Sequence, residues 1–258
     1  MTRYLILAAS ICVCLPTASV AAHLTVAAYG GAAVPLGGLA AEDPGYFNWF
    51  WTPPNPQGHG LVDIRGFTLT GSNMAAGPAA ALALRAGLTP WLELEWGGGR
   101  YFLAPRATWV RDAIHNPKTS VAAVTMGARG TRRWGPVAAS AGAGAGYYLE
   151  TLTLDAAGHI ESGFVYDKVD TIDNTTDIGA PGAYAGAGAS YALADRWSLE
   201  LDLRYHIVFN RGDYDVLIHE EYGYEPYHHT DYVFEIPLHK EYADQFLDVR
   251  AGLAYAVF

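Results

Sequence analysis

Charged side chains recur at alternate positions within otherwise apolar stretches of this chain. Between Trp197 and Phe209 one set of alternate residues is apolar throughout, while the other begins with serine and three charged residues. Successive side chains of a β-strand point to opposite faces, so such charges share one face. Across the chain these faces carry six acids, four arginines and a histidine: Arg85, Glu93, Glu95, Arg129, Glu150, Glu200, Asp202, Arg204, His206, Asp248 and Arg250. Residues of these types can neutralise one another in ion pairs or line a path for protons or small ions.

Two other groups of residues have the types that bind metal ions. The histidines His219, His228, His229 and His239 lie near Glu220, Glu221 and Asp231. A transition-metal site needs several of them to converge. The acids between Thr151 and Pro181 lack the spacing of a calcium loop. We predict solvated loops, with no metal and no cofactor; divalent-ion bridging to anionic lipid heads is the alternative.

Glycines alternate with alanines from Gly142 to Gly146 and again near Gly186 and Gly188. The first run neither opens a helix nor matches the full glycine fingerprint of dinucleotide-binding loops. If the charged faces point inward, these glycines lie opposite the arginines and leave room for their side chains.

The alternating stretches define eight predicted strands. They cover about 24–34, 79–88, 91–102, 119–132, 136–150, 182–193, 197–209 and 245–258. The alanine run at 79–88 has helical propensity, but Pro90 and the Leu-Glu-Leu-Glu alternation after it favour a hairpin.

The connections between these strands alternate in length. Three are tight turns near residues 89, 134 and 195, marked by Trp91, Trp134 and Trp197, and four are longer loops. An even number of long strands with this asymmetry is typical of an outer-membrane barrel, in which the tryptophans form an aromatic girdle. We therefore predict an all-β fold, an eight-stranded antiparallel up-and-down transmembrane β-barrel whose charges face a crowded interior and pair there. A soluble lipocalin-like barrel would instead place its apolar faces inward.

The N-terminus and the composition predict an exported protein. A basic head, an apolar run and small residues predict a signal peptide over residues 1–22, followed by one barrel domain over residues 23–258. Cys12 and Cys14 both lie in the first segment, which excludes a disulfide framework in the barrel. A net charge of −10 disfavours nucleic-acid binding. No later segment has 18 uninterrupted apolar residues, so helical spans are not expected.

With these features the chain resembles the small bacterial outer-membrane barrels of the OmpA, OmpX and OmpW type. The matching segments are Val26 to Gly31, Asp195 to His206 and the last strand, which ends on Phe258. The resemblance implies location in the bacterial outer membrane, with lipids and the barrel-assembly machinery as partners and Phe258 as the assembly signal. Phe258 is one residue out of step with the outward set of its strand, which leaves the terminal register open.

His206 also resembles, in its local context, the catalytic histidine of the outer-membrane lipid A deacylases, which is followed two residues later by a nucleophilic serine. Here that position is Val208, which has no nucleophilic oxygen. We therefore predict no enzymatic activity and a surface-exposed or structural outer-membrane protein. A narrow porin-like channel for small solutes is the alternative that the OmpW resemblance implies, and a lipid A-modifying enzyme is a distant third.

Overall fold

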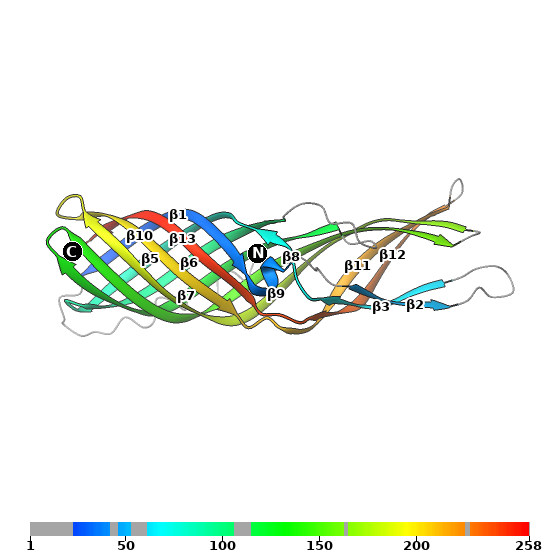
Figure 1. Cartoon of the computed structure of the whole chain (residues 1–258), viewed down its shortest axis with the longest axis horizontal. Coiled ribbons are helices and arrows are strands. Elements are labelled where there is room, and N and C mark those ends of the chain that lie inside the picture. Colours follow the sequence, from blue (N-terminus) through cyan, green and yellow to red (C-terminus); the bar gives the residue numbers. More distant parts are fainter. Residues whose placement is uncertain are drawn as a thin grey trace.

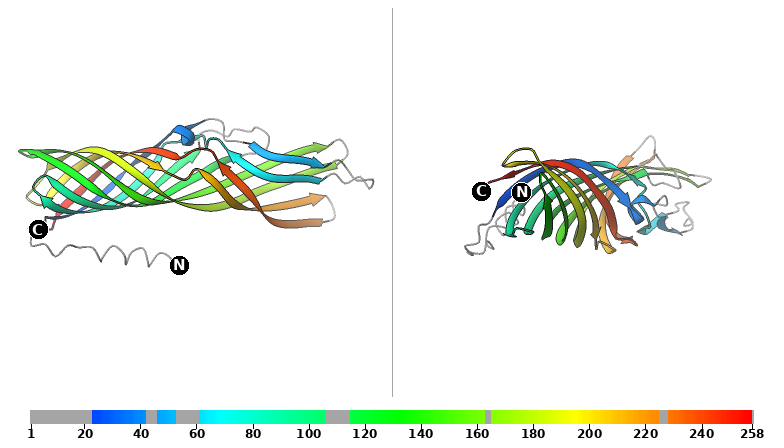
Figure 2. Two further views of the ribbon diagram at one scale, coloured as in Figure 1. Left: turned by 90° about the horizontal axis from the view of Figure 1, so that it is seen from below. Right: turned by 60° about the vertical axis from the view of Figure 1, so that its left-hand side comes forward.

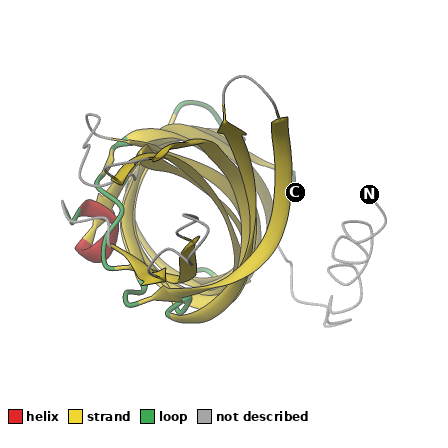
Figure 3. Cartoon of the chain, turned by 90° about the vertical axis from the view of Figure 1, so that its right-hand side faces the viewer, coloured by secondary structure: helices red, strands yellow, loops and turns green. Residues whose placement is uncertain are grey.

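The alternating strands close into a ring around a central axis (Figure 3). The computed structural model describes residues 23–41, 46–52, 61–105, 115–162, 165–224 and 228–257. The ring contains β1 (Leu24–Leu36), β5 (Gly77–Thr89), β6 (Leu92–Pro105), β7 (His115–Trp134), β8 (Val137–Ser162), β9 (Val165–Ala192), β10 (Trp197–Val208) and β13 (Asp244–Ala256). The remaining elements are the 3₁₀ turn η2 (Gly37–Ala40), β2 (Tyr46–Thr52), β3 (Leu61–Leu69), β4 (Met74–Ala75), β11 (Gly212–Tyr224) and β12 (His228–Lys240).

Each strand of the ring pairs with the barrel strands before and after it in the chain. The order is β1, β5, β6, β7, β8, β9, β10 and β13, and every pair in it is antiparallel. The first and last strands close the ring, in register from Thr25 opposite Ala256 to Leu36 opposite Gln245. The predicted eight-stranded up-and-down barrel is confirmed, and closure leaves no free edge in the ring.

The barrel has an apolar exterior and a charged interior. Along β10 the side chains of Leu199, Leu201 and Leu203 are 49%, 57% and 48% exposed, whereas the intervening Glu200 and Asp202 are 4% and 2% exposed. This polarity is the reverse of that of a soluble barrel. The period-two pattern puts the leucines and the charges on opposite faces of the sheet. The ring is closed with the charged face inside and the leucines outside.

One end of the barrel is built from tight turns. They lie at Pro90–Trp91, at Gly135–Pro136, where Gly135 has a φ of +61°, and between β9 and β10. The three predicted girdle residues Trp91, Trp134 and Trp197 all lie at this end, 62%, 53% and 47% exposed. We call it the turn end.

At the other end, long hairpins extend well beyond the ring (Figures 1 and 2). Three segments predicted as loops form strands instead: β2 and β3 lie within 40–74, β8 and β9 continue through 151–181, and β11 and β12 lie within 210–244. The hairpins also pair sideways, β9 with β11 and β12 with β3. The loop prediction was wrong because it gave weight to the turn-forming and acidic residues of these segments. They also contain runs of high β propensity, such as Tyr232-Val-Phe-Glu-Ile.

Some predicted features lie outside the described residues. These are the signal peptide over residues 1–22 and the assembly signal at Phe258. Among the residues that the structure does describe, no helix combines the length and the apolar character needed to cross a membrane.

Candidate functional site

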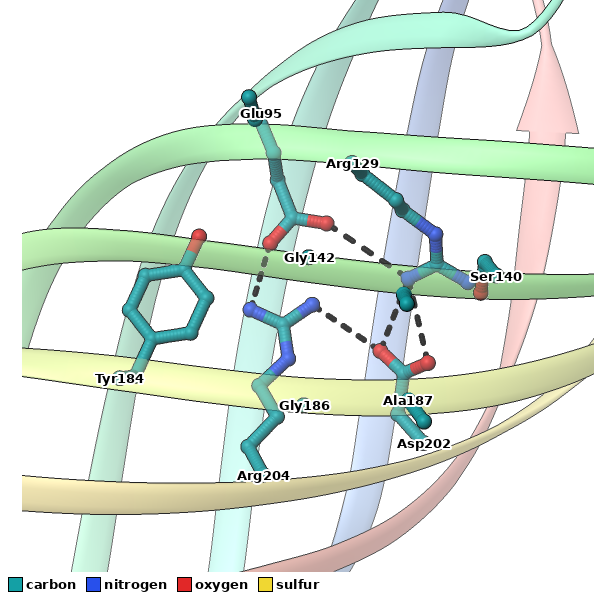
Figure 4. Close-up of a pocket in the computed structure, with 11 residues that line it drawn as sticks. Glu95, Arg129, Ser140, Gly142, Tyr184, Gly186, Ala187, Asp202 and Arg204 are labelled. Atoms are coloured by element: carbon teal, nitrogen blue, oxygen red, sulfur yellow. Dashed lines mark hydrogen bonds and ion pairs between the residues drawn. The ribbon is translucent and has the colours of Figure 1, made fainter.

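The interior charges meet around Glu95, which projects from β6 into the middle of the barrel (Figure 4). Its Oε1 lies 2.5 Å from Arg204 Nη1, and its Oε2 lies 3.1 Å from Arg85 Nε and 3.7 Å from Arg129 Nη1. The three arginines come from β10, β5 and β7, so a single carboxylate joins four strands. Glu95 is 2% exposed, and water contributes little to its solvation.

Asp202 of β10 is a second centre beside the first. Its Oδ2 lies 3.0 Å from Arg129 Nη1, 3.0 Å from Arg204 Nη2 and 3.3 Å from Arg250 Nη2. Arg129 and Arg204 therefore bridge Asp202 and Glu95, and Arg250 adds strand β13 to the network.

Glu200 forms a third centre, nearer the turn end. Its Oε1 accepts from Arg85 Nη1 at 2.8 Å, and its Oε2 accepts from Arg85 Nη2 at 2.6 Å and from the Tyr29 hydroxyl at 2.5 Å. The paired geometry uses both carboxylate oxygens, which is the strong form of an arginine–carboxylate contact.

We call these groups, with Asp248, the charge network. It comprises Arg85, Glu95, Arg129, Glu200, Asp202, Arg204, Asp248 and Arg250, all of them buried. Four arginines face four acids, so the formal charges cancel. Buried ions are tolerated when they are paired in this way, and removing one partner is costly.

Glycines on the neighbouring strands make room for this network. A Cβ atom at Gly186 would lie 2.8 Å from Arg204 Cγ, and one at Gly188 would clash with Asp202 Oδ1. A Cβ atom at Gly142 would lie 3.3 Å from the Arg129 Cα. The Gly-Ala alternation of β8 and β9 therefore has a packing function: alanines face outward, and inward glycines leave room for Arg129, Asp202 and Arg204.

His206 lies in an aromatic layer on the side of the network away from the turn end. Its ring stacks on Phe246 with centroids 4.7 Å apart, and its Nδ1 shares a hydrogen bond of 2.9 Å with the Tyr148 hydroxyl. Its Nε2 is 4.0 Å from Asp248 Oδ2. His206 and Val208 are both 1% exposed. A lipid ester outside the barrel has no access to this imidazole.

Glu150 belongs to a separate cluster at the hairpin end. Its Oε2 accepts from Lys240 Nζ at 2.6 Å and from Asn210 Nδ2 at 2.7 Å, and the same two donors bind Asp244. We call these four residues the upper cluster. It lies beyond Tyr147, and the stretch of β8 from Val137 to Tyr147 already has the length of about 9–11 residues that a membrane strand needs.

Burial and the neighbouring Asp244 carboxylate raise the pKa of Glu150 to about 7. Burial alone would lower the pKa of Lys240, but the carboxylates of Asp244 and Glu150 raise it above its ordinary value. The lysine is therefore a fixed positive charge, while Glu150 can change its protonation near neutral pH.

Sequence reasoning missed several members of these sites. Tyr29, Asn210 and Lys240 are buried and bonded to predicted charges. Asp244 is buried and accepts from Lys240 and Asn210. Asp244 shares the parity of Asp248 and Arg250, so extending the alternation of the last strand by a few residues would have found it. Lys240 lies in a segment predicted as a loop, where no parity had been assigned. Of the predicted set, Glu93 lies apart, half-buried near the turn end.

The interior between these sites is filled. The cavity beside Glu95 and Arg129 measures about 10 Å³, which is room for about one water molecule. Further up, the buried side chains of Leu39, Met74 and Phe246 pack together under the hairpins. Within the described ranges, no three His, Cys, Asp or Glu side chains are grouped so that they could hold a metal ion. Of the four loop histidines, His239 pairs with Asp213 at 2.5 Å.

Comparison with solved structures finds other proteins of similar outline. The crystal structure of Neisserial surface protein A has 13% identity and a TM-score of 0.45, covering 92% of this chain and 99% of that one. A major outer membrane protein from Thermus thermophilus has 14% identity and a TM-score of 0.49, covering 92% and 99%. The outer membrane protease OmpT from Escherichia coli has 9% identity and a TM-score of 0.39, covering 91% and 95%. No protein-family model and no curated protein matches the chain.

Proposed function

We propose that the chain is a non-enzymatic integral protein of a bacterial outer membrane, in which the closed barrel anchors a group of long β-hairpins on the cell surface. The observation that carries the proposal is the reversed polarity of the barrel. An apolar band with leucines about half exposed is costly in water, whereas lipid solvates it. Outer-membrane lipids are then the partners of the band, and the barrel-assembly machinery is the partner during insertion.

The hairpins are the part that acts on the surroundings. In the bacterial outer membrane, short turns face the periplasm and long connections face outward. The hairpins β8–β9 and β11–β12 pair with each other beyond the barrel, which favours a fixed outer surface over separate loops. Residues 151–181 carry six acids and one lysine, so this surface favours cationic partners.

Cysteine labelling on intact cells tests the orientation. Residues 23–258 contain no cysteine, so single probes can be placed at Asp213, on β11, and at Asp195, in a tight turn. Both aspartates are exposed, which makes Asp213→Cys and Asp195→Cys matched variants. We expect a membrane-impermeant maleimide to label Asp213→Cys on intact cells and Asp195→Cys only after the outer membrane is permeabilised. The opposite order would reject the proposal.

A conductance measurement separates this function from that of a narrow channel. The ion pairs at Glu95 and Asp202 and the apolar layer above them fill the cross-section in series. We therefore expect no steady openings from the wild-type protein in planar bilayers. Steady openings that change in Arg204→Ala would favour the porin-like alternative, because Arg204 joins both centres.

A further inference from the structure

A second cavity lies inside the turn end of the barrel, below the charge network. It measures about 140 Å³, similar to engineered cavities that hold a six-carbon ring. Its inner lining includes Arg85, Arg129 and Glu200, and its outer lining includes Asp195 and Arg196 of an exposed turn. We call it the turn-end vestibule. It is a polar space large enough for a ligand of about six non-hydrogen atoms.

At the inner end of the vestibule, the acceptor oxygens of Glu200 are hydrogen-bonded, whereas some donors of Arg129 have no partner among the described residues. Both oxygens of Glu200 already accept from Arg85, and one of them also accepts from Tyr29. The acceptors are thus occupied. By contrast, the contacts of Arg129 with described residues all run through Nη1, to Asp202 and Glu95. A guanidinium has five N–H donors, so Nε and Nη2 remain available, on a residue that is only 7% exposed.

A second donor stands beside Arg129. Thr131 is two residues further along β7, on the same face, and also lines the vestibule. In the described part of the chain its buried Oγ1 has no hydrogen-bond partner. Ser190 and Ser198 add hydroxyl groups from β9 and β10. Each hydroxyl can donate one hydrogen bond, so together with the free edge of Arg129 they suit a ligand that supplies acceptors.

We propose that the turn-end vestibule binds a small oxyanion, a phosphate or carboxylate group, on the free edge of the Arg129 guanidinium with the Thr131 hydroxyl as a second donor. At the rim, Arg133 and Arg196 are balanced by Glu93 and Asp195. The rim therefore adds little net attraction, and the selectivity for an anion comes from the inner donors. The site faces away from the hairpins and does not depend on their function.

Calorimetric titration of the full chain, refolded in detergent micelles, tests the proposal. Inorganic phosphate and acetate are titrated separately at constant ionic strength, with chloride as the reference anion, to distinguish phosphate from carboxylate. We expect saturable binding of at least one oxyanion. Arg129→Lys keeps the charge but loses the planar fork, and should weaken binding about tenfold. Glu93→Gln removes a rim carboxylate and should strengthen it.

Two further variants keep the test decisive. Thr131→Val has nearly the same shape as the wild type and should bind several-fold more weakly, even if Arg129→Lys fails to fold. Arg132→Gln removes an arginine from the outer face, where the guanidinium lies over Trp134, and should bind as the wild type does. The proposal is overturned if neither oxyanion binds saturably, or if Thr131→Val and folded Arg129→Lys keep the wild-type affinity.

Discussion

Glu95 is a central residue of the charge network, because three arginines share its two oxygens. Its replacement leaves buried positive charge without a counter-charge. We expect Glu95→Gln to lower the free energy of unfolding by about 3–5 kcal/mol. Urea titration in detergent measures this change, with the loss of heat-modifiable electrophoretic mobility as the signal of unfolding.

Glu93→Gln is the matched control, since it makes the same substitution two residues away on the same face of β6. Glu93 is only half-buried, and water solvates it in part. We expect a change within about 0.5 kcal/mol, as for other surface substitutions. Equal effects of the two variants would contradict a special role for Glu95.

Glu150 gives the protein a pH-dependent stability. Its pKa is raised from 4.5 to about 7 on folding, so the folded state binds the proton more tightly than the unfolded state does. Stability from this group is therefore complete below pH 4.5 and falls as the pH rises to about 7. We expect Glu150→Gln to flatten this part of the profile of unfolding midpoint against pH. If the slope of the unfolding midpoint against pH is unchanged by the substitution, the pH dependence comes from other groups.

At the scale of elements, the close approach of β9 and β10 depends on glycine. A Cβ atom at Gly188 would clash with Asp202 Oδ1, whereas one at Gly30, on the outer face of β1, would have open space around it. We expect Gly188→Ala to destabilise the barrel by about 1–3 kcal/mol, the usual cost of overpacking. Gly30→Ala should leave the urea midpoint unchanged, and a similar loss in both variants would indicate a general effect of glycine replacement.

The strands of the ring could be predicted because their pattern is set by the two environments that they separate. Alternation placed Glu95, Asp202 and Arg204 on the inner faces from spacing alone. The partners of each charge could not be predicted, because Arg85 and Glu200 meet across the interior through strand order and stagger that periodicity does not contain. The hairpins beyond the ring were missed for a related reason. There both faces lie outside the apolar band, and the alternation that reveals a membrane strand is weak.

At the scale of the whole molecule, the exterior distinguishes a membrane barrel from a soluble one. Leu201 lies midway along the apolar face of β10 and is 57% exposed. We expect Leu201→Arg to destabilise the barrel in lipid vesicles by about 2–4 kcal/mol, as at a bilayer midplane. Reversible unfolding in vesicles, monitored by tryptophan fluorescence, gives the value.

Leu193→Arg is the control for this substitution. Leu193 is equally exposed, at 55%, but lies at the turn end beside Trp197. Near the edge of the apolar band the cost of an arginine should fall to about 0–1 kcal/mol. Equal costs at the two positions would contradict the assignment of Leu201 to the middle of a bilayer and of Leu193 to its edge.

The pairing of β1 with β13 has a consequence for the timing of assembly. These strands are joined last, because Thr25 and Ala256 lie at opposite ends of the barrel sequence and a contact of that separation is slow to form. Until the ring closes, Arg85 of β5 and Glu200 of β10 remain apart, and an open sheet in lipid would carry unpaired ions as well as unpaired backbone edges. Pairs between adjacent strands, such as Arg85 with Glu95, form without closure, whereas the pairing of Arg85 with Glu200 coincides with it. A misregistered chain would leave Arg85 and Glu200 without each other, which disfavours its transfer into the bilayer.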